Sequence, residues 1–261
     1  MEGNPDHTGA VTGRRRVFFG LLAALVAAGA LGVFVATRDD AASGEGGGVV
    51  LVHGYGGGPD DLAELADLLR ARGRLVRAVT LPDNGFGDIR DSADEVDRAV
   101  RALPDGPVDV VGFSLGGVVA RSWYARSADR TRARVVVTLA APHHGTDLAA
   151  LAGVFGCSGA CAQLVPTSSF LRELNRDESP PGPAWVALWT AFDETVVPAL
   201  SATLDGAVNV RVQDVCADSR VGHSEFARDR LVLGIVLRAL DGALAAPPSA
   251  ADCAPLRATP G

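Results

Sequence analysis

The chain has 261 residues, of which 48% are hydrophobic and 5% aromatic, and its formal net charge is −7. This length is enough for one sizeable domain and short for two. The acidic balance argues against a nucleic-acid partner, which needs a basic surface. We therefore expect one globular domain that acts as a monomer and binds no nucleic acid.

The N-terminal region combines a basic cluster with an apolar run. Three arginines, residues 14–16, precede the apolar residues Val17 to Ala36. This pattern is typical of an export signal, and Arg15-Arg16 followed by Val-Phe-Phe resembles a twin-arginine signal. The run is also long enough to cross a bilayer. We predict that residues 1–45 are an export signal or a membrane anchor plus linker, so that the protein is secreted or held at the outer face of the cell membrane.

Strand and helix signals alternate from Val49 onward, and residues 46–261 read as a single domain. Apolar, β-branched runs predict strands at residues 49–52, 75–81, 108–111, 135–140, 185–192 and 207–212. Helical spacing of apolar residues predicts helices at 59–72, 88–103, 117–123 and 225–240. Strands joined by helical crossovers predict an α/β fold, with about six strands in a mainly parallel sheet and helices on both faces.

The pentapeptide Gly112-Phe113-Ser114-Leu115-Gly116 lies between the predicted strand 108–111 and the predicted helix 117–123. Strand, Gly-x-Ser-x-Gly and helix, in this order, form the turn that presents the serine nucleophile of an α/β-hydrolase. The glycines are needed because neighbouring backbones approach closely at this strained turn. We predict that Ser114 is a catalytic nucleophile. The alternative is a glycine-rich turn with a solvated serine.

A serine nucleophile needs an imidazole to take its proton and a carboxylate to orient the imidazole. In this fold the chain order is serine, acid, histidine. Asp193 follows the apolar run 185–192 and His223 precedes the last predicted helix, so the sequence favours Ser114, Asp193 and His223. The competing acids and histidines are Glu194, Asp214, Asp218, His7, His53, His143 and His144.

A glycine-rich segment, residues 53–58, follows the first predicted strand. The oxyanion of a tetrahedral intermediate needs two backbone N–H donors, one from the residue after the nucleophile and one from this loop. We predict that Leu115 and Tyr55 supply them and that His53 shapes the loop. A phosphate-binding loop is the alternative, but the segment lacks the Gly-Lys-Ser/Thr ending of a P-loop and the G-x-G-x-x-G spacing.

The four cysteines are Cys157, Cys161, Cys216 and Cys253. In an exported chain they favour disulfides, and no histidine lies at zinc-ligand spacing from any of them. Of the three possible pairings we favour Cys157–Cys161, which closes a short loop, and Cys216–Cys253, which ties down the Ala- and Pro-rich tail. The first pair lies in a Gly-, Ser- and Pro-rich stretch, residues 142–183, that predicts an excursion of loops and short helices over the active-site rim.

Seven segments of the chain match the sequence motifs of one known family, and they are residues 53–57, 110–117, 141–146, 160–164, 170–175, 189–198 and 222–223. Together they resemble the class 2 lipases, which are small secreted bacterial triacylglycerol lipases of the α/β-hydrolase fold. The resemblance implies that nucleophile, acid and base are Ser114, Asp193 and His223, with oxyanion donors at Tyr55 and Leu115. The N-terminal segment departs from the family, because it is longer and more anchor-like than a usual secretory signal.

The resemblance implies hydrolysis of fatty-acyl esters such as acylglycerols through an acyl-enzyme, with no cofactor or metal. The sequence shows no clear loop for the structural calcium that some lipases hold. Two alternatives stay open. An acyltransferase or thioesterase would use the same residues with another acceptor or acyl donor, and a non-catalytic binding protein of the same fold would usually lack one member of the triad.

Overall fold

The computed structural model describes residues 47–154, 156–242 and 244–258, and the predicted export signal or anchor lies outside these ranges. Within the described ranges, no helix combines the length and the apolar character needed to span a bilayer.

Six strands form one sheet, and they are β1 (Gly48–Val52), β2 (Val76–Val79), β3 (Val108–Phe113), β4 (Ala133–Leu139), β5 (Ala184–Trp189) and β6 (Val208–Arg211). Their order across the sheet is β2-β1-β3-β4-β5-β6, and every pairing is parallel. The predicted α/β fold is confirmed. Because helices cover both faces, the central strands are continuous apolar runs rather than alternating ones.

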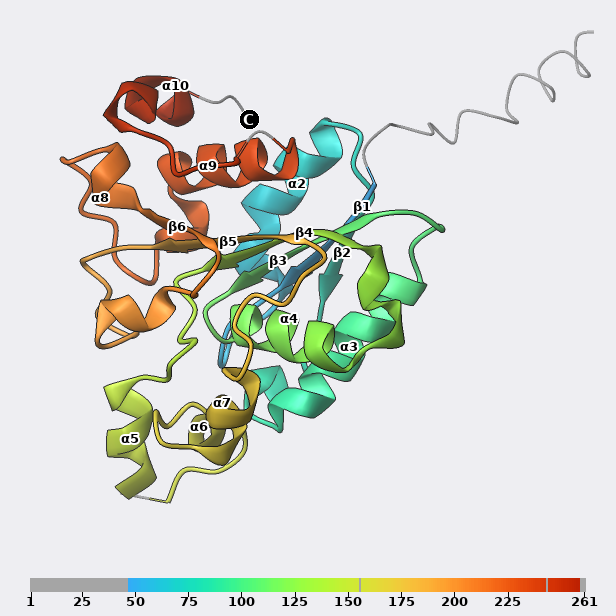
Figure 1. Ribbon diagram of the computed structural model, residues 1–261, viewed down its shortest axis with the longest axis vertical. Coiled ribbons are helices and arrows are strands. Elements are labelled where there is room, and N and C mark those ends of the chain that lie inside the picture. Colours follow the sequence, from blue (N-terminus) through green and yellow to red (C-terminus); the bar gives the residue numbers. More distant parts are fainter. Residues whose placement is uncertain (1–46, 155, 243, 259–261) are drawn as a thin grey trace, which may run out of the picture. The chain divides into compact units, whose positions relative to one another are not determined.

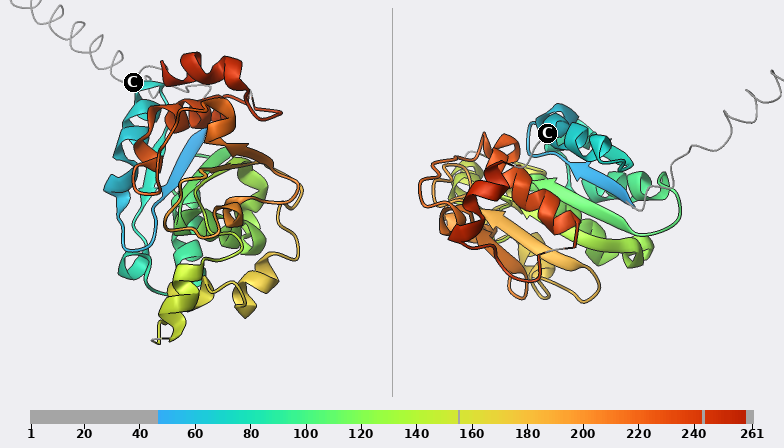
Figure 2. Two further views of the ribbon diagram at one scale, coloured as in Figure 1. Left: turned by 90° about the vertical axis from the view of Figure 1, so that its left-hand side faces the viewer. Right: turned by 90° about the horizontal axis from the view of Figure 1, so that it is seen from above.

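Helices pack on both faces of the sheet (Figures 1 and 2). One face carries α2 (Ala63–Ala71) and α9 (Arg230–Leu240), and the other carries α3 (Ile89–Arg101) and α4 (Leu115–Arg126). Strand β1 shows how the sequence divides between these two cores. Val49 and Leu51 belong to the core under α2 and α9, whereas Val50 and Val52 belong to the core under α3 and α4. Successive side chains of a strand point to opposite faces, so one apolar strand serves both layers.

The predicted excursion over residues 142–183 contains three short helices, α5 (Asp147–Val154), α6 (Ala160–Gln163) and α7 (Ser169–Leu174). Helix α7 packs against α4 (Figure 1). The other described helices are short, and they are η1 (Pro59–Leu62), η2 (Pro82–Gly85), η3 (Ala128–Arg132), η4 (Ala199–Ala202), α8 (Val212–Val215), η5 (Phe226–Arg228), η6 (Ala250–Asp252) and α10 (Cys253–Arg257).

Two predicted boundaries near the candidate site are wrong. Strand β5 ends at Trp189 rather than at residue 192, so Asp193 lies in the loop beyond it. The closing helix begins at Arg230 rather than at Glu225, because the side chain of Asp229 caps it by accepting from the N–H groups of Leu231 and Val232. His223 therefore lies in a loop before η5 and not directly before the helix.

Candidate active site

Ser114 lies at the tight turn between β3 and α4. Its φ of 53° and ψ of −124° fall outside the conformations that a residue other than glycine normally adopts. The turn also needs its glycines, because a Cβ on Gly112 would lie 2.3 Å from the carbonyl oxygen of Gly116. A Cβ on Gly116 would lie 2.1 Å from the carbonyl oxygen of Val52. The sequence motif thus encodes a strained backbone that presents the serine at the carboxyl edge of the sheet.

The structure brings Ser114, His223 and Asp193 together. His223 Nε2 lies 3.0 Å from Ser114 Oγ, and His223 Nδ1 lies 3.0 Å from Asp193 Oδ2. The side chains of His223 and Asp193 are only 9% and 2% exposed. With the Nδ1 proton donated to the carboxylate, Nε2 is left to accept from the serine hydroxyl, as general-base catalysis requires.

Asp193 is held by the loop that carries it. Its Oδ1 accepts from the backbone N–H groups of Thr195 and Val196 at 2.9 and 2.7 Å, which leaves Oδ2 for His223. The carboxylate therefore cannot rotate away from the imidazole without breaking two further hydrogen bonds.

Glu194, one of the competing acids, contacts the backbone of His223 and not its ring. Its Oε2 accepts from the His223 N–H at 3.0 Å, and its Oε1 lies 3.5 Å from Ser224 Oγ. The hydrogen bond from the His223 amide holds the pKa of Glu194 below its usual range. The sequence places Glu194 among the rivals to Asp193, and nothing in its pattern indicates a role in holding the histidine loop.

The remaining competing acids lie in other ion pairs. Asp214 pairs with Arg211, and Asp218 pairs with Arg257 at 2.9 Å. Both carboxylates are solvent-exposed. Neither contacts His223 in the part of the chain that the structure describes.

The competing histidines also have other partners, except His7, which lies outside the described residues. His143 is fully buried beside Thr138 Oγ1, and burial holds its pKa well below its usual range. His144 Nε2 lies 2.8 Å from Glu178 Oε1. Neither reaches Ser114.

The glycine-rich loop 53–58 lies directly against the nucleophile. A Cβ on Gly54 would lie 3.1 Å from Ser114 Cβ. His53 fixes the loop, because its Nε2 accepts from Leu81 N–H at 3.0 Å and its Nδ1 then donates to Gly54 O at 2.8 Å. Across the described residues, the amides of Tyr55 and Leu115 donate to no acceptor, so both can donate to an oxyanion.

A second strained turn, which is not among the predicted features, supports this loop. Asp83 and Asn84 in η2 have φ angles of 48° and 53°. The carbonyl of Asn84 accepts from Gly56 N–H at 2.8 Å, and a Cβ on Gly85 would lie 3.0 Å from the Leu115 side chain. The Pro-Asp-Asn-Gly sequence is typical of a turn, which is the one signal that could have drawn attention to it.

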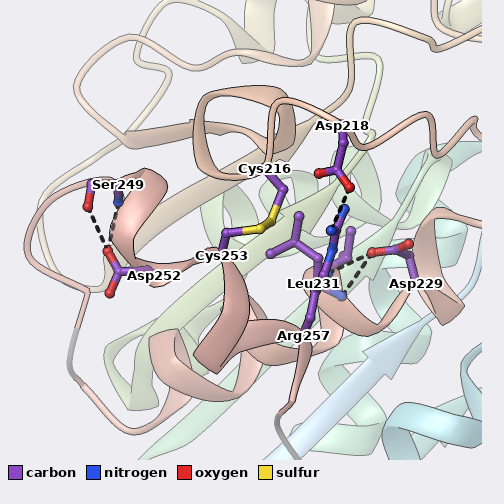
Figure 3. The surroundings of a disulfide bond; sticks show 9 residues. Cys216, Asp218, Asp229, Leu231, Ser249, Asp252, Cys253 and Arg257 are labelled. Atoms are coloured by element: carbon purple, nitrogen blue, oxygen red, sulfur yellow. Dashed lines mark hydrogen bonds and ion pairs between the residues drawn. A yellow bond between two sulfur atoms is a disulfide. The ribbon is translucent and has the colours of Figure 1, made fainter.

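All four cysteines are paired, Cys157 with Cys161 and Cys216 with Cys253. Figure 3 shows the second disulfide, which joins the end of α8 to the start of α10. Among the described residues, one group of possible metal ligands comes together, Cys216, Asp218 and Cys253. Both of its sulfurs are in the disulfide, so this group offers no thiolate.

The arrangement of an α/β-hydrolase is a parallel sheet with a strained serine at its carboxyl edge, next to a histidine that in turn contacts an aspartate. Residues 49–259 match the alpha/beta hydrolase family. The chain belongs to this family.

Part of the chain is similar to two proteins named pimeloyl-[acyl-carrier protein] methyl ester esterase. The one from Chromobacterium violaceum is 36% identical over 96 residues, which are 36% of this chain and 37% of that protein. The one from Neisseria meningitidis is 39% identical over 90 residues, which are 32% of this chain and 33% of that protein. The chain thus matches about a third of the length of either relative.

Solved lipase structures share the fold. Aspergillus fumigatus lipase B superposes with a TM-score of 0.67 at 20% identity, over 78% of this chain and 54% of that one. The mature form of Bacillus licheniformis lipase BlEst2 superposes with a TM-score of 0.60 at 17% identity, over 78% of this chain and 94% of that one. These similarities establish the architecture alone.

Proposed function

We propose that the protein is a serine carboxylic ester hydrolase with Ser114 as nucleophile, His223 as base and Asp193 as its orienting acid. The observation that carries the proposal is the chain of two 3.0 Å contacts from Ser114 Oγ through His223 to Asp193, which starts at a serine with strained backbone. A structural serine would need neither the strain nor the buried acid–base pair.

The mechanism follows from these contacts. Ser114 Oγ attacks the ester carbonyl while His223 Nε2 takes the hydroxyl proton, and Asp193 stabilises the resulting imidazolium. The amides of Tyr55 and Leu115 bind the oxyanion. The imidazolium then gives its proton to the leaving alcohol. Water, activated by His223 in the same way, attacks the acyl-enzyme and releases the carboxylic acid.

The substrate that we propose is a fatty-acyl ester of the kind that class 2 lipases cleave. Apolar side chains near the candidate site support this. Tyr55 and Phe86 are 46% and 48% exposed and stack edge to face with ring centroids 4.7 Å apart, and Phe192, next to Asp193, is 44% exposed. Exposed aromatic surface favours binding of an apolar acyl or alkyl group.

A methyl ester is a second candidate substrate. The local identity to the two pimeloyl-[acyl-carrier protein] methyl ester esterases favours it, since an ester with a small alcohol needs the same nucleophile, base and oxyanion donors. Acyl transfer to an alcohol and thioester hydrolysis would also proceed through the same acyl-enzyme.

We infer that the domain acts outside the cytoplasm, after export or on an anchor formed by residues 17–36. The basic cluster and apolar run support this location. Pairing of all four cysteines also supports it, because disulfides persist in oxidising compartments.

The proposed function is tested by hydrolysis of p-nitrophenyl esters from acetate to palmitate, and of methyl esters, by the full-length protein and its Ser114→Ala variant. We expect turnover by the wild type and none above background by the variant. A preference for long chains would assign a lipase and a preference for short chains an esterase. Product analysis with added alcohol distinguishes hydrolysis from acyl transfer. Equal turnover by the wild type and the Ser114→Ala variant would refute the proposal.

A further inference from the structure

A cavity of about 440 Å³ lies between α4 and the excursion, away from the candidate active site. Its walls come from the start of α3, the last turns of α4, η3, α7 and the loop that follows α7. Helix α4 starts beside Ser114 and ends at Arg126, and at 1.5 Å per residue its far end lies about 17 Å along the axis. None of the triad residues lines the cavity. Its volume falls within the usual range for small-molecule sites.

The floor of the cavity is apolar. Tyr124 and Phe170 are each 6% exposed, and Leu174, Pro180 and Pro181 complete the lining on the α7 side. A floor of this kind favours an apolar chain over a small hydrated ion.

The rim of the cavity is basic. Four arginines line it, Arg90, Arg126, Arg130 and Arg176, against two acids, Glu173 and Asp177. This local excess of positive charge is unusual in a chain whose net charge is −7. The excess attracts anions to this face.

Two of the four guanidinium groups, those of Arg90 and Arg126, have partners within the protein, and the other two are free to bind a ligand. Arg90 stacks over the Phe170 ring at 5.0 Å and approaches Glu173 Oε2 at 3.5 Å. Arg126 donates to the carbonyl of Arg90 and lies 3.7 Å from Asp94. Across the described ranges of the chain, the side chains of Arg130 and Arg176 have no ion pair or hydrogen bond.

We propose that this cavity binds an amphipathic carboxylate, such as a medium-chain fatty acid, with its chain on the Phe170 floor and its head group at Arg130 and Arg176. A guanidinium binds a carboxylate through two parallel hydrogen bonds, and the apolar floor removes the chain from water. The ligand must match both the apolar floor and the basic rim. An inorganic anion would leave the apolar floor exposed to water, and a neutral lipid would form no ion pair with the arginines. The assignment does not depend on Ser114 being a nucleophile.

Equilibrium dialysis of the full-length protein against radiolabelled octanoate tests the proposal. Acetate and 1-octanol serve as probes of the head group and the chain alone. We expect saturable octanoate binding, with acetate and 1-octanol at least tenfold weaker. In the Arg130→Gln/Arg176→Gln variant, octanoate affinity should fall at least tenfold. Ala125→Trp, which fills the cavity from an exposed position of α4, should abolish this binding.

The matched control is Arg172→Gln, the same substitution at an exposed α7 position that does not line the cavity. Its octanoate affinity should stay within twofold of the wild type. Octanoate binding that survives both Ala125→Trp and the double substitution would place the ligand elsewhere and overturn the proposal. Equal affinity for acetate or for 1-octanol would overturn it too, because either result would leave one half of the cavity without a role. The dialysis is run on protein whose Ser114 has first been blocked with an alkylphosphonate, so that octanoate bound at the candidate active site does not contribute to the binding measured in any of the four proteins.

Discussion

Glu194 accepts a hydrogen bond from the backbone N–H of His223 at 3.0 Å, while its neighbour Asp193 contacts the Nδ1 atom of the same histidine. One two-residue segment thus fixes both the main chain and the ring of the proposed base. Because Glu194 touches no atom of the triad side chains in these contacts, we assign it a positioning role.

We predict that Glu194→Ala lowers kcat about tenfold, which corresponds to about 1.4 kcal/mol and is typical of one hydrogen bond to a charged group at an exposed site. KM for short esters should change little, since Glu194 holds the base rather than the substrate. Glu194→Gln keeps an acceptor oxygen and should recover most of the loss. Steady-state kinetics on p-nitrophenyl butyrate gives kcat and KM for the wild type and both variants.

Glu225→Ala is the control for this prediction, because Glu225 is exposed on the loop that carries His223 and its side chain caps no helix. It should leave kcat unchanged. If Glu194→Ala and Glu225→Ala behave alike, Glu194 has no positioning role.

The tight turn between β3 and α4, residues 112–116 (the nucleophile elbow), predicts an unusual response to a glycine-to-alanine change in a helix. Alanine normally stabilises an open helical position, by up to about 1 kcal/mol. Gly116→Ala should instead destabilise the fold by about 1–3 kcal/mol, because the new Cβ would lie 2.1 Å from the carbonyl oxygen of Val52. Urea unfolding compares it with Gly153→Ala in α5, where the nearest side-chain atom is 3.7 Å away. Equal stability of the two variants would contradict the close packing of the elbow.

The two disulfides should contribute unequally to stability. Cys216–Cys253 closes a separation of 37 residues and Cys157–Cys161 one of four. The loss of loop-closure entropy in the unfolded chain predicts about 4 kcal/mol for the first and about 2 kcal/mol for the second. Replacing each pair by serines and measuring unfolding in urea tests the order. A larger loss for the short loop would show that the bonds act mainly through the native state.

The C-terminal tail should show a defined acid response. Hydrogen bonds from Arg238 and then from Ser249 lower the pKa of Asp252 from 3.8 to about 2. A pKa that is lower in the folded state means that the carboxylate stabilises the fold above 3.8, and that this contribution is lost as the pH falls through about 2. The difference in melting temperature between wild type and Asp252→Asn should therefore be largest near neutral pH and should fade across that acid window. Asp241→Asn, at an exposed position, should show no such difference.

The parts of the site that depend on local backbone requirements could be predicted from the sequence. Gly-x-Ser-x-Gly between an apolar run and a helix specifies a turn that few other sequences tolerate, and the structure has it at Ser114. The order of serine, acid and histidine along the chain then favours Asp193 and His223 over several alternatives. In the structure His223 contacts Asp193 on one side and Ser114 on the other.

What could not be predicted depends on contacts between distant segments. The hydrogen bond from His223 to Glu194 joins a backbone amide to a side chain. Every residue except proline has such an amide, so the residue type at position 223 gives no indication of this contact. The Pro-Asp-Asn-Gly sequence indicates a turn at Asp83 and Asn84. It does not indicate that the carbonyl group of Asn84 accepts from Gly56 N–H and so supports the oxyanion loop. The late start of α9 reflects the Asp229 cap, which competes with a helical pattern that continues upstream.

The proposed mechanism requires that Ser114 is a nucleophile activated by His223. Incubation of the full-length protein with a p-nitrophenyl alkylphosphonate, followed by peptide mass spectrometry, tests this in one measurement. We predict one covalent adduct, on Ser114, formed at least 100-fold more slowly in His223→Ala, in line with the usual contribution of a general base of about 10²–10⁴. An adduct on another residue, or labelling of Ser114 at the same rate without His223, would contradict the proposed triad.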